Sequence, residues 1–132
     1  MTQYNRIKFT LIWDKLNDPA FTTIRSWNRG KEEYYKSHIG QRFTVLKIER
    51  AYQQTPGSLI CRAWLKDVTV VNPSFLPASL VQRDVTIEGK VDQAWCEKIL
   101  GMRKALLLTF DKSPVSTQKK LETDPLGLVV AA

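Results

Sequence analysis

Cysteine and histidine are scarce in this sequence of 132 residues, which contains two cysteines, Cys61 and Cys96, and one histidine, His38. Two cysteines without a Cys-x-x-Cys pair do not make a disulfide framework. Together with a single histidine they offer too few sulfur and nitrogen ligands for a zinc site. We therefore expect no metal and no other cofactor, and we expect both cysteines to be small core residues rather than nucleophiles.

Long apolar runs are lacking too, as the N-terminal residues 1–13 (MTQYNRIKFTLIW) illustrate. A membrane-spanning helix needs about 20 consecutive apolar residues, and a signal peptide needs an apolar stretch of about 7–15. We therefore expect no insertion into a membrane and a cytoplasmic, reducing location.

Acidic residues are few in the first half of the chain. Residues 1–66 contain 12 lysines and arginines against 5 acidic residues, whereas residues 67–132 contain 8 of each, so the net charge of +7 lies entirely in the first half. Such asymmetry favours a polyanionic partner, and nucleic acid is the preferred interpretation. The alternatives are basic residues that only increase solubility, or that meet an anionic membrane surface or a small anion.

The hydrophobic pattern predicts one α+β domain over residues 1–112, because 132 residues suffice for one domain and are few for two. Residues 58–71 alternate with the period of a half-buried strand, and a Pro-Gly turn joins them to residues 42–52 in a predicted hairpin. Two further strands are predicted at residues 7–13 and 103–112. Strands around one core with short helices between them indicate a small β-barrel.

Short helices are predicted at residues 31–38, 73–85 and 91–100. Residues 14–21 are predicted to form a turn or a one-turn helix. The final segment, residues 113–132, is predicted to be a flexible or loosely docked extension that could contact a protein partner.

Basic and aromatic residues interleave in FTTIRSWNRGKEEYY (residues 21–35) and just beyond it. Lysine and arginine neutralise phosphates, and exposed aromatic faces stack on unpaired bases. The candidates for these two roles are Arg25, Arg29, Lys31 and Lys36 for phosphate and Trp27 and Tyr34 for stacking. For the two aromatic residues, burial in the core remains an equal alternative, and Phe21 is expected in the core.

Five short segments, in this order, resemble the ASCH domain family of the PUA-like superfamily. They are FTTIRSW (21–27), IGQRFTVL (39–46), RAWLKDVTVV (62–71), RDVTIEGK (83–90) and LLLTF (106–110), within a resemblance that spans residues 7–112. The resemblance implies a PUA-like β-barrel with a cleft lined by Thr23, Arg25 and Glu88. It also implies RNA binding, and one bacterial branch of the family hydrolyses 4-acetylcytidine.

In that branch a lysine, a threonine and a glutamate have catalytic roles. The resemblance carries the threonine to Thr23 and the glutamate to Glu88, but the lysine position is Ala20 in this chain. Alanine cannot activate a hydroxyl group. Lys15 or Lys31 could supply an amine from elsewhere, although the spacing requires neither.

The favoured hypothesis is therefore a nucleic-acid-binding module, for RNA more than DNA. In it the basic residues contact phosphate, the two aromatic residues stack, and Thr23 and Glu88 form hydrogen bonds in the cleft. The alternative is an amidohydrolase that acts on a modified nucleoside such as 4-acetylcytidine, with Thr23 and Glu88 as its catalytic residues.

Overall fold

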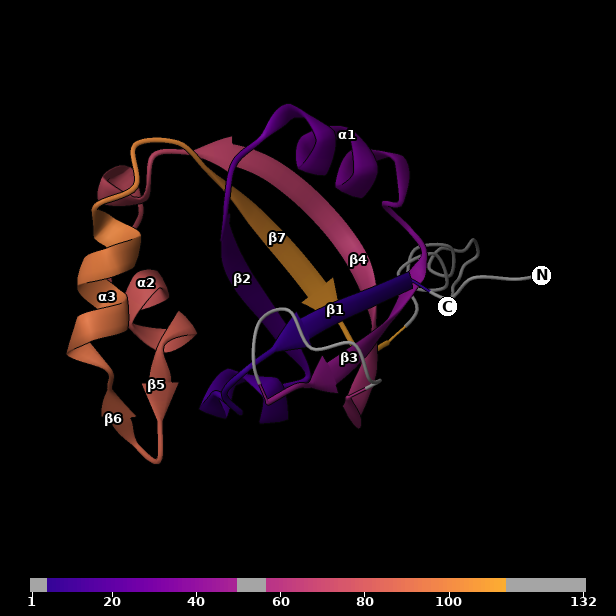
Figure 1. Ribbon diagram of the computed structural model, residues 1–132, viewed down its shortest axis with the longest axis horizontal. Coiled ribbons are helices and arrows are strands. Elements are labelled where there is room, and N and C mark those ends of the chain that lie inside the picture. Colours follow the sequence, from indigo (N-terminus) through magenta and orange to yellow (C-terminus); the bar gives the residue numbers. More distant parts are fainter. Residues whose placement is uncertain (1–4, 50–56, 114–132) are drawn as a thin grey trace, which may run out of the picture.

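A computed structural model describes residues 5–49 and 57–113 of the chain. Figure 1 shows a central five-stranded sheet with the order β1-β3-β4-β7-β2 and a small sheet of two strands, β5-β6. The strands are β1 (Asn5–Phe9), β2 (Ala20–Ser26), β3 (Arg42–Lys47), β4 (Ser58–Val71), β5 (Thr86–Ile87), β6 (Lys90–Val91) and β7 (Ala105–Asp111). The fold class is α+β, as the sequence predicted.

The long strand β4 organises the central sheet, because it pairs antiparallel with β3 on one side and with β7 on the other. The pairing of β3 with β4 confirms the predicted hairpin strands. β1 pairs parallel with β3, and β2 pairs antiparallel with β7. The sequence did not predict β2 as a strand, since its adjacent buried residues Thr23 and Ile24 interrupt the simple alternation.

The expected β-barrel is not closed by strand pairing. β1 and β2 are the two edges of the sheet, and no backbone ladder joins them in the described part of the chain. The sheet is nevertheless strongly curved (Figure 1). One side chain connects the two edges, because Nη2 of Arg25 donates a hydrogen bond of 3.0 Å to the carbonyl oxygen of Lys8.

Three α-helices and two 3₁₀ helices accompany the sheet. They are η1 (Asp14–Asn17), α1 (Arg29–Ser37), η2 (Pro73–Phe75), α2 (Ala78–Asp84) and α3 (Gln93–Leu100). Side chains cap three of the N-termini: Asn28 accepts a hydrogen bond from the Lys31 amide, Asn72 accepts one from the Ser74 amide, and Asp92 accepts one from the Trp95 amide. The helix predicted at residues 73–85 is divided into η2 and α2, because Pro77 has no N–H group to continue a helix.

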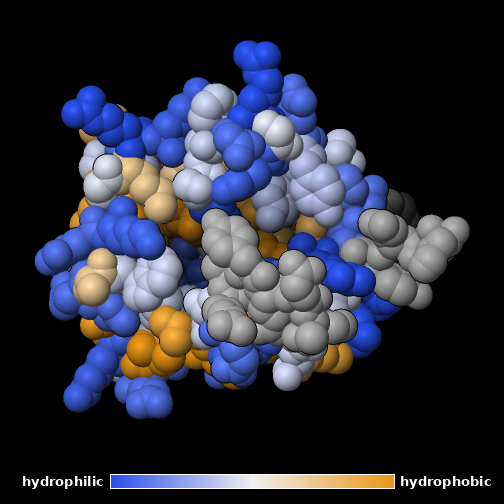
Figure 2. All heavy atoms as spheres, in the orientation of Figure 1, coloured by the Kyte–Doolittle hydropathy of each residue, from blue (hydrophilic) through white to orange (hydrophobic). Residues whose placement is uncertain are grey.

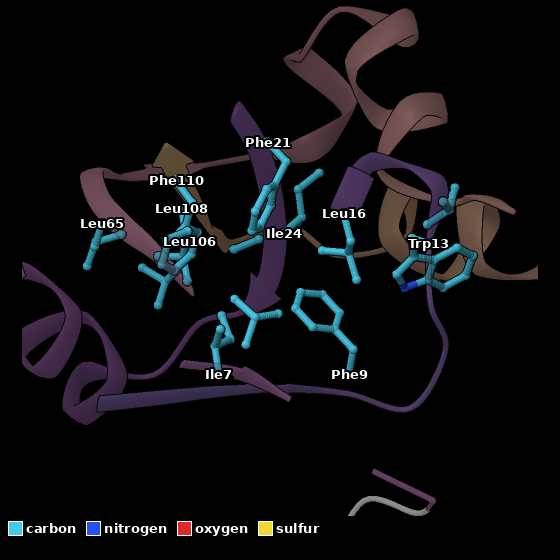
Figure 3. Packing of buried hydrophobic residues seen from close by; sticks show 14 of the residues in the cluster. Ile7, Phe9, Trp13, Leu16, Phe21, Ile24, Leu65, Leu106, Leu108 and Phe110 are labelled. Carbon is cyan, nitrogen blue, oxygen red and sulfur yellow. The ribbon is translucent and has the colours of Figure 1, made fainter. Parts of the chain in front are cut away.

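The hydrophobic core fills the concave side of the sheet. Figure 3 shows Phe9 of β1, Leu16 of η1 and Ile24 of β2 pointing toward one another. Phe43 and Phe110 are fully buried, and their ring centroids lie 5.5 Å apart in an edge-to-face arrangement. The core therefore unites strands from both ends of the described chain.

The first strand ends earlier than the sequence predicted. It ends at Phe9 rather than at residue 13, and Trp13 is buried beyond it. Of the two cysteines, Cys96 is buried and Cys61 is half-buried. Residues 53–56 of the predicted turn and residues 114–132 of the predicted extension lie outside the described residues. Within residues 5–49 and 57–113, no helix has the length and apolar character to cross a membrane.

Candidate functional site

A pocket of about 460 Å³ lies between the two edge strands of the central sheet, β1 and β2. Residues from η1, α1, α2 and α3 complete its walls. A pocket of a few hundred Å³ is typical of sites for small molecules. In Figure 2, hydrophilic residues dominate the visible face, and hydrophobic residues show between them.

Lys15 is buried in this pocket, which is rare for a lysine. It belongs to η1 and is only 2% exposed, because the next residue, Leu16, anchors the short helix in the core. Its Nζ atom lies 3.5 Å from Oδ2 of Asp84. Burial lowers the pKa of Lys15 from 10.5 to about 8, Asp84 opposes this shift, and Arg25 adds to it. Lys15 can therefore exchange its proton near neutral pH.

Asp84, at the end of α2, is the acidic partner of Lys15 in the pocket. Its Oδ1 atom accepts a hydrogen bond of 2.6 Å from the hydroxyl group of Thr22. Its buried Oδ2 atom has no hydrogen-bond partner among the described residues and faces the amine of Lys15. Burial raises the pKa of Asp84, and the positive charge of Lys15 opposes this shift most strongly. The two shifts have opposite signs because withdrawal from water disfavours both charges.

Thr23 and Arg25 enter the pocket from β2. Thr23 is 3% exposed, and its Oγ1 atom accepts a hydrogen bond of 3.3 Å from Nε of Arg25. The guanidinium of Arg25 also lies 4.7 Å from the centre of the Phe9 ring. Because Thr23 accepts from Arg25, the hydroxyl proton of Thr23 is left to donate elsewhere. A cation beside a hydroxyl group also favours the loss of that proton.

Aromatic rings form part of the pocket wall. Trp13 and Trp95 meet edge to face with their ring centroids 6.0 Å apart, and both line the pocket together with Phe9 and Tyr35. Burial raises the pKa of Tyr35, although Arg25 opposes this shift. Flat apolar walls of this kind suit a planar ligand, because ring faces and edges pack well against it.

Hydrogen bonds and an ion pair attach η1 and the residue after it to the elements around them. Arg83 forms a two-pronged ion pair with Asp18 at 2.8 and 3.2 Å, which ties α2 to the segment that follows η1. The carboxylate of Asp14 accepts hydrogen bonds of 2.9 Å from the amides of Glu88 and Gly89. Both contacts hold η1 in place, and they thereby hold Lys15 opposite Asp84.

The structure places Glu88 away from the pocket. Glu88 is exposed at the turn between β5 and β6, with a positive φ of 52°, and it does not line the pocket. No ion pair between Arg25 and Glu88 forms, although the sequence suggested that the two residues share one cleft. In the segment RDVTIEGK the aspartate, Asp84, points into the pocket instead, because it ends α2 whereas Glu88 lies in the hairpin turn beyond it.

Apart from Arg25, the predicted phosphate and stacking residues lie on or beside α1 rather than at the pocket. Three of them form side-chain hydrogen bonds with neighbours: Lys31 with Ser26, Lys36 with Glu32, and the Trp27 indole with the Glu32 carboxylate. Lys104 also covers the ring of Trp27, with Nζ 3.7 Å from the centroid. Arg29 is exposed at the start of α1, and Tyr34 is 40% exposed. Of the eight predicted site residues, Thr23 and Arg25 are the two that line the pocket.

Sequence comparison gives this pocket no precedent: no protein-family model, no curated protein and no solved structure matches the chain. Within residues 5–49 and 57–113, no three histidine, cysteine, aspartate or glutamate side chains converge as a metal site requires. The function must therefore be inferred from the pocket residues themselves.

The sequence analysis mentioned Lys15 only as a possible source of an amine, and it did not identify Asp84 as a site residue. The signal that could have found Lys15 is its position between Trp13 and Leu16, which are both buried.

Proposed function

We propose that the protein is an amidohydrolase that acts on an acylated nucleobase, with 4-acetylcytidine as the reference substrate. One observation carries this proposal: a buried lysine with a pKa of about 8 shares a pocket with a buried threonine and a buried aspartate. In the hydrolase branch that the ASCH-like segments resemble, the catalytic lysine corresponds to residue 20, where this chain has alanine. Lys15 lies in the same pocket as Thr23 and offers an amine from η1 instead of β2.

The proposed chemistry begins with Lys15 as a base. At pH 7 roughly a tenth of a lysine with this pKa is neutral, which is enough to accept the hydroxyl proton of Thr23. The Thr23 oxygen then bonds to the amide carbonyl carbon, and the guanidinium of Arg25 stabilises the negative charge on the carbonyl oxygen. The carbon–nitrogen bond breaks, and the leaving amine receives the proton from Lys15. Water next hydrolyses the acyl ester on Thr23 and releases the carboxylic acid.

Asp84 has a positioning role in this scheme. It holds the amine of Lys15 at 3.5 Å and is itself fixed by Thr22 at 2.6 Å. Its charge also keeps the pKa of Lys15 from falling further. Without Asp84 we expect Lys15 to be neutral at a lower pH and less well oriented.

Release of cytidine from 4-acetylcytidine, followed by chromatography between pH 6 and 9.5, tests the proposal. We expect the rate to rise with pH up to about 8 and then to level off, because neutral Lys15 is the active form. Lys15→Met and Thr23→Val should each reduce the rate by 100-fold or more, within the usual range for loss of a base or nucleophile. Lys31→Met, a lysine change outside the pocket, is the matched control. A rate that is unchanged in Thr23→Val would overturn the proposal.

We also propose that the fold is that of an ASCH-type, PUA-like domain. An ASCH-type, PUA-like domain would explain a curved sheet whose edge strands flank a cleft, and this chain has β1 and β2 in such positions. An experimental structure superposed on known PUA-like domains tests this relationship. A strand order that differs from those domains would refute it.

RNA binding is the second candidate function, and the uneven charge of the chain supports it. The exposed side chain of Arg29 has no bonded partner among the described residues, and Tyr34, which also belongs to α1, is 40% exposed. Fluorescence anisotropy with single- and double-stranded RNA and DNA at two salt concentrations tests binding. We expect Arg29→Gln to weaken binding and Lys98→Gln, on α3, to leave it unchanged. Absence of salt-dependent binding to all four nucleic acids would exclude this function.

A further inference from the structure

The pocket has an excess of positive charge, and two of its basic residues, Arg6 and Lys8, have no role in the proposed hydrolysis. Four of its lining residues are basic, namely Arg6, Lys8, Lys15 and Arg25, and one, Asp84, is acidic. The single carboxylate is already engaged by the amine of Lys15 and the hydroxyl group of Thr22. Among the described lining residues, three basic side chains therefore lack an acidic counterpart. Positive charge in a recess with apolar walls attracts anions more strongly than the same charge on an open surface.

Arg6 and Lys8 are the outermost of these cations. They alternate along β1 with Ile7 and Phe9, which are buried in the core, so both basic residues are exposed on the other side of the strand. Residues two apart on a strand lie about 6.6 Å from each other along its axis. Two cations at this spacing can both reach the oxygen atoms of one phosphate group.

The charged groups of these two side chains are available to a ligand. No hydrogen bond or ion pair to the Arg6 guanidinium or the Lys8 amine forms within residues 5–49 and 57–113. The other cations near the site differ, because Lys15 faces Asp84 and Arg25 bonds to Thr23 and to the Lys8 carbonyl oxygen. The last bond attaches the backbone of Lys8 to the interior of the pocket. Arg6 and Lys8 therefore line the same pocket as the groups proposed to perform the chemistry, and they do so from the exposed side of β1.

We propose that Arg6 and Lys8 form a phosphate subsite, so that the substrate is a nucleoside phosphate whose base lies against the aromatic wall. This inference rests on the proposed function for the identity of the base, but the subsite itself is defined by the two cations. The phosphate could belong to a free mononucleotide or to a strand of RNA. Both present the same anionic oxygen atoms to Arg6 and Lys8.

Direct binding, measured without hydrolysis, tests the subsite. The probes are cytidine, cytidine 5′-monophosphate, inorganic phosphate and a pentanucleotide of cytidine. Quenching of tryptophan fluorescence reports occupancy, because Trp13 and Trp95 line the pocket. We expect the monophosphate to bind about tenfold more tightly than cytidine at low salt, as charge-assisted hydrogen bonds at a partly exposed site allow. The double variant Arg6→Gln/Lys8→Gln should remove this difference, while Lys66→Gln, an exposed cation on β4 outside the pocket, should retain it.

The outcomes of this experiment test the phosphate subsite independently of the proposed hydrolysis. Equal affinity for cytidine and its monophosphate would overturn the subsite, even if 4-acetylcytidine were hydrolysed. Tighter binding of the monophosphate and of inorganic phosphate, lost in the double variant, would support the subsite even if no hydrolysis occurred. A pentanucleotide that binds more tightly than the monophosphate, with a steeper dependence on salt, would identify RNA as the source, and equal affinity would identify the mononucleotide.

Discussion

The buried pair of Lys15 and Asp84 makes a prediction about stability that does not depend on any substrate. Asp84→Asn keeps the shape of the side chain but removes the charge that opposes Lys15. Loss of one partner from a buried ion pair typically costs 3–5 kcal/mol. Lys15 can limit this loss by releasing its proton. A lysine with a pKa of about 8 already costs about 3 kcal/mol at pH 7 relative to an ordinary lysine, and a neutral lysine costs about 5 kcal/mol. The difference limits the loss, so we expect the variant to lose about 1–2 kcal/mol at pH 7.

The sign of the pH dependence follows from proton binding. In the wild type the pKa of Lys15 is about 8 in the folded protein and has its ordinary value of 10.5 in the unfolded chain, so between these values the unfolded chain binds the extra proton. Stability attributable to Lys15 therefore rises with pH in this window. Without Asp84 the folded pKa falls below 8, so the rise begins at lower pH in the variant. The stability difference between variant and wild type should consequently shrink as the pH approaches 8 and stay constant above it.

Urea denaturation of both proteins between pH 6 and 9.5 measures this difference. Lys36→Ala, which breaks the exposed ion pair with Glu32 on α1, is the matched control and should cost less than about 1 kcal/mol without a change near pH 8. A second variant, Lys15→Met/Asp84→Asn, should recover much of the lost stability, because no unpaired charge remains buried. A loss in Asp84→Asn that is identical at every pH would refute the view that Lys15 and Asp84 form a buried charged pair.

Three further predictions concern residues outside the pair. Gly57→Ala should destabilise the protein by several kcal/mol in thermal unfolding, because an added Cβ would overlap the carbonyl oxygen of Lys47, whereas Gly101→Ala, whose Cβ would have room, should be nearly neutral. Asp14→Ala should cost about 1–3 kcal/mol in urea denaturation and increase amide hydrogen exchange at Glu88 and Gly89, whose amides would lose their acceptor. Phe110→Ala should cost about 3–5 kcal/mol, because this ring is fully buried between Phe21 and Phe43.

Sequence patterns predicted the regular elements well where one periodicity continued for many residues. The alternation over residues 58–71 and the helical pattern over residues 91–100 are local features, and the structure has β4 at the first and α3 within the second. The strand β2 was missed because its adjacent buried residues Thr23 and Ile24 interrupt the alternation, and its pairing partner β7, some 85 residues away, supplies no neighbouring strand in the sequence. The hairpin of β5 and β6 was missed because strands of two residues are too short to show a period.

The candidate site was predicted only in part, because two of its residues share one strand and two others come from separate elements. Thr23 and Arg25 lie on one strand at a spacing that places both side chains at the pocket, and the sequence segment identified them together. Lys15 reaches the pocket from η1 and Asp84 from α2, and only the folded chain brings these elements together. Lysine and aspartate are usually exposed, so composition and periodicity assign them to the surface unless their partner is known.

The order of strands in the central sheet has a consequence for how the protein folds. β1 and β2 are made first, yet β2 has one pairing partner in the described sheet, β7, whose residues Ala105–Asp111 come at the end of the described chain. During synthesis β2 must therefore remain unpaired until nearly the whole domain has left the ribosome. Contacts between residues so distant in sequence slow folding, because a long loop must close before they form. Assembly of the pocket is therefore expected to be a late step of folding, and a nascent chain that lacks β7 should expose Phe21 and Ile24 to chaperones.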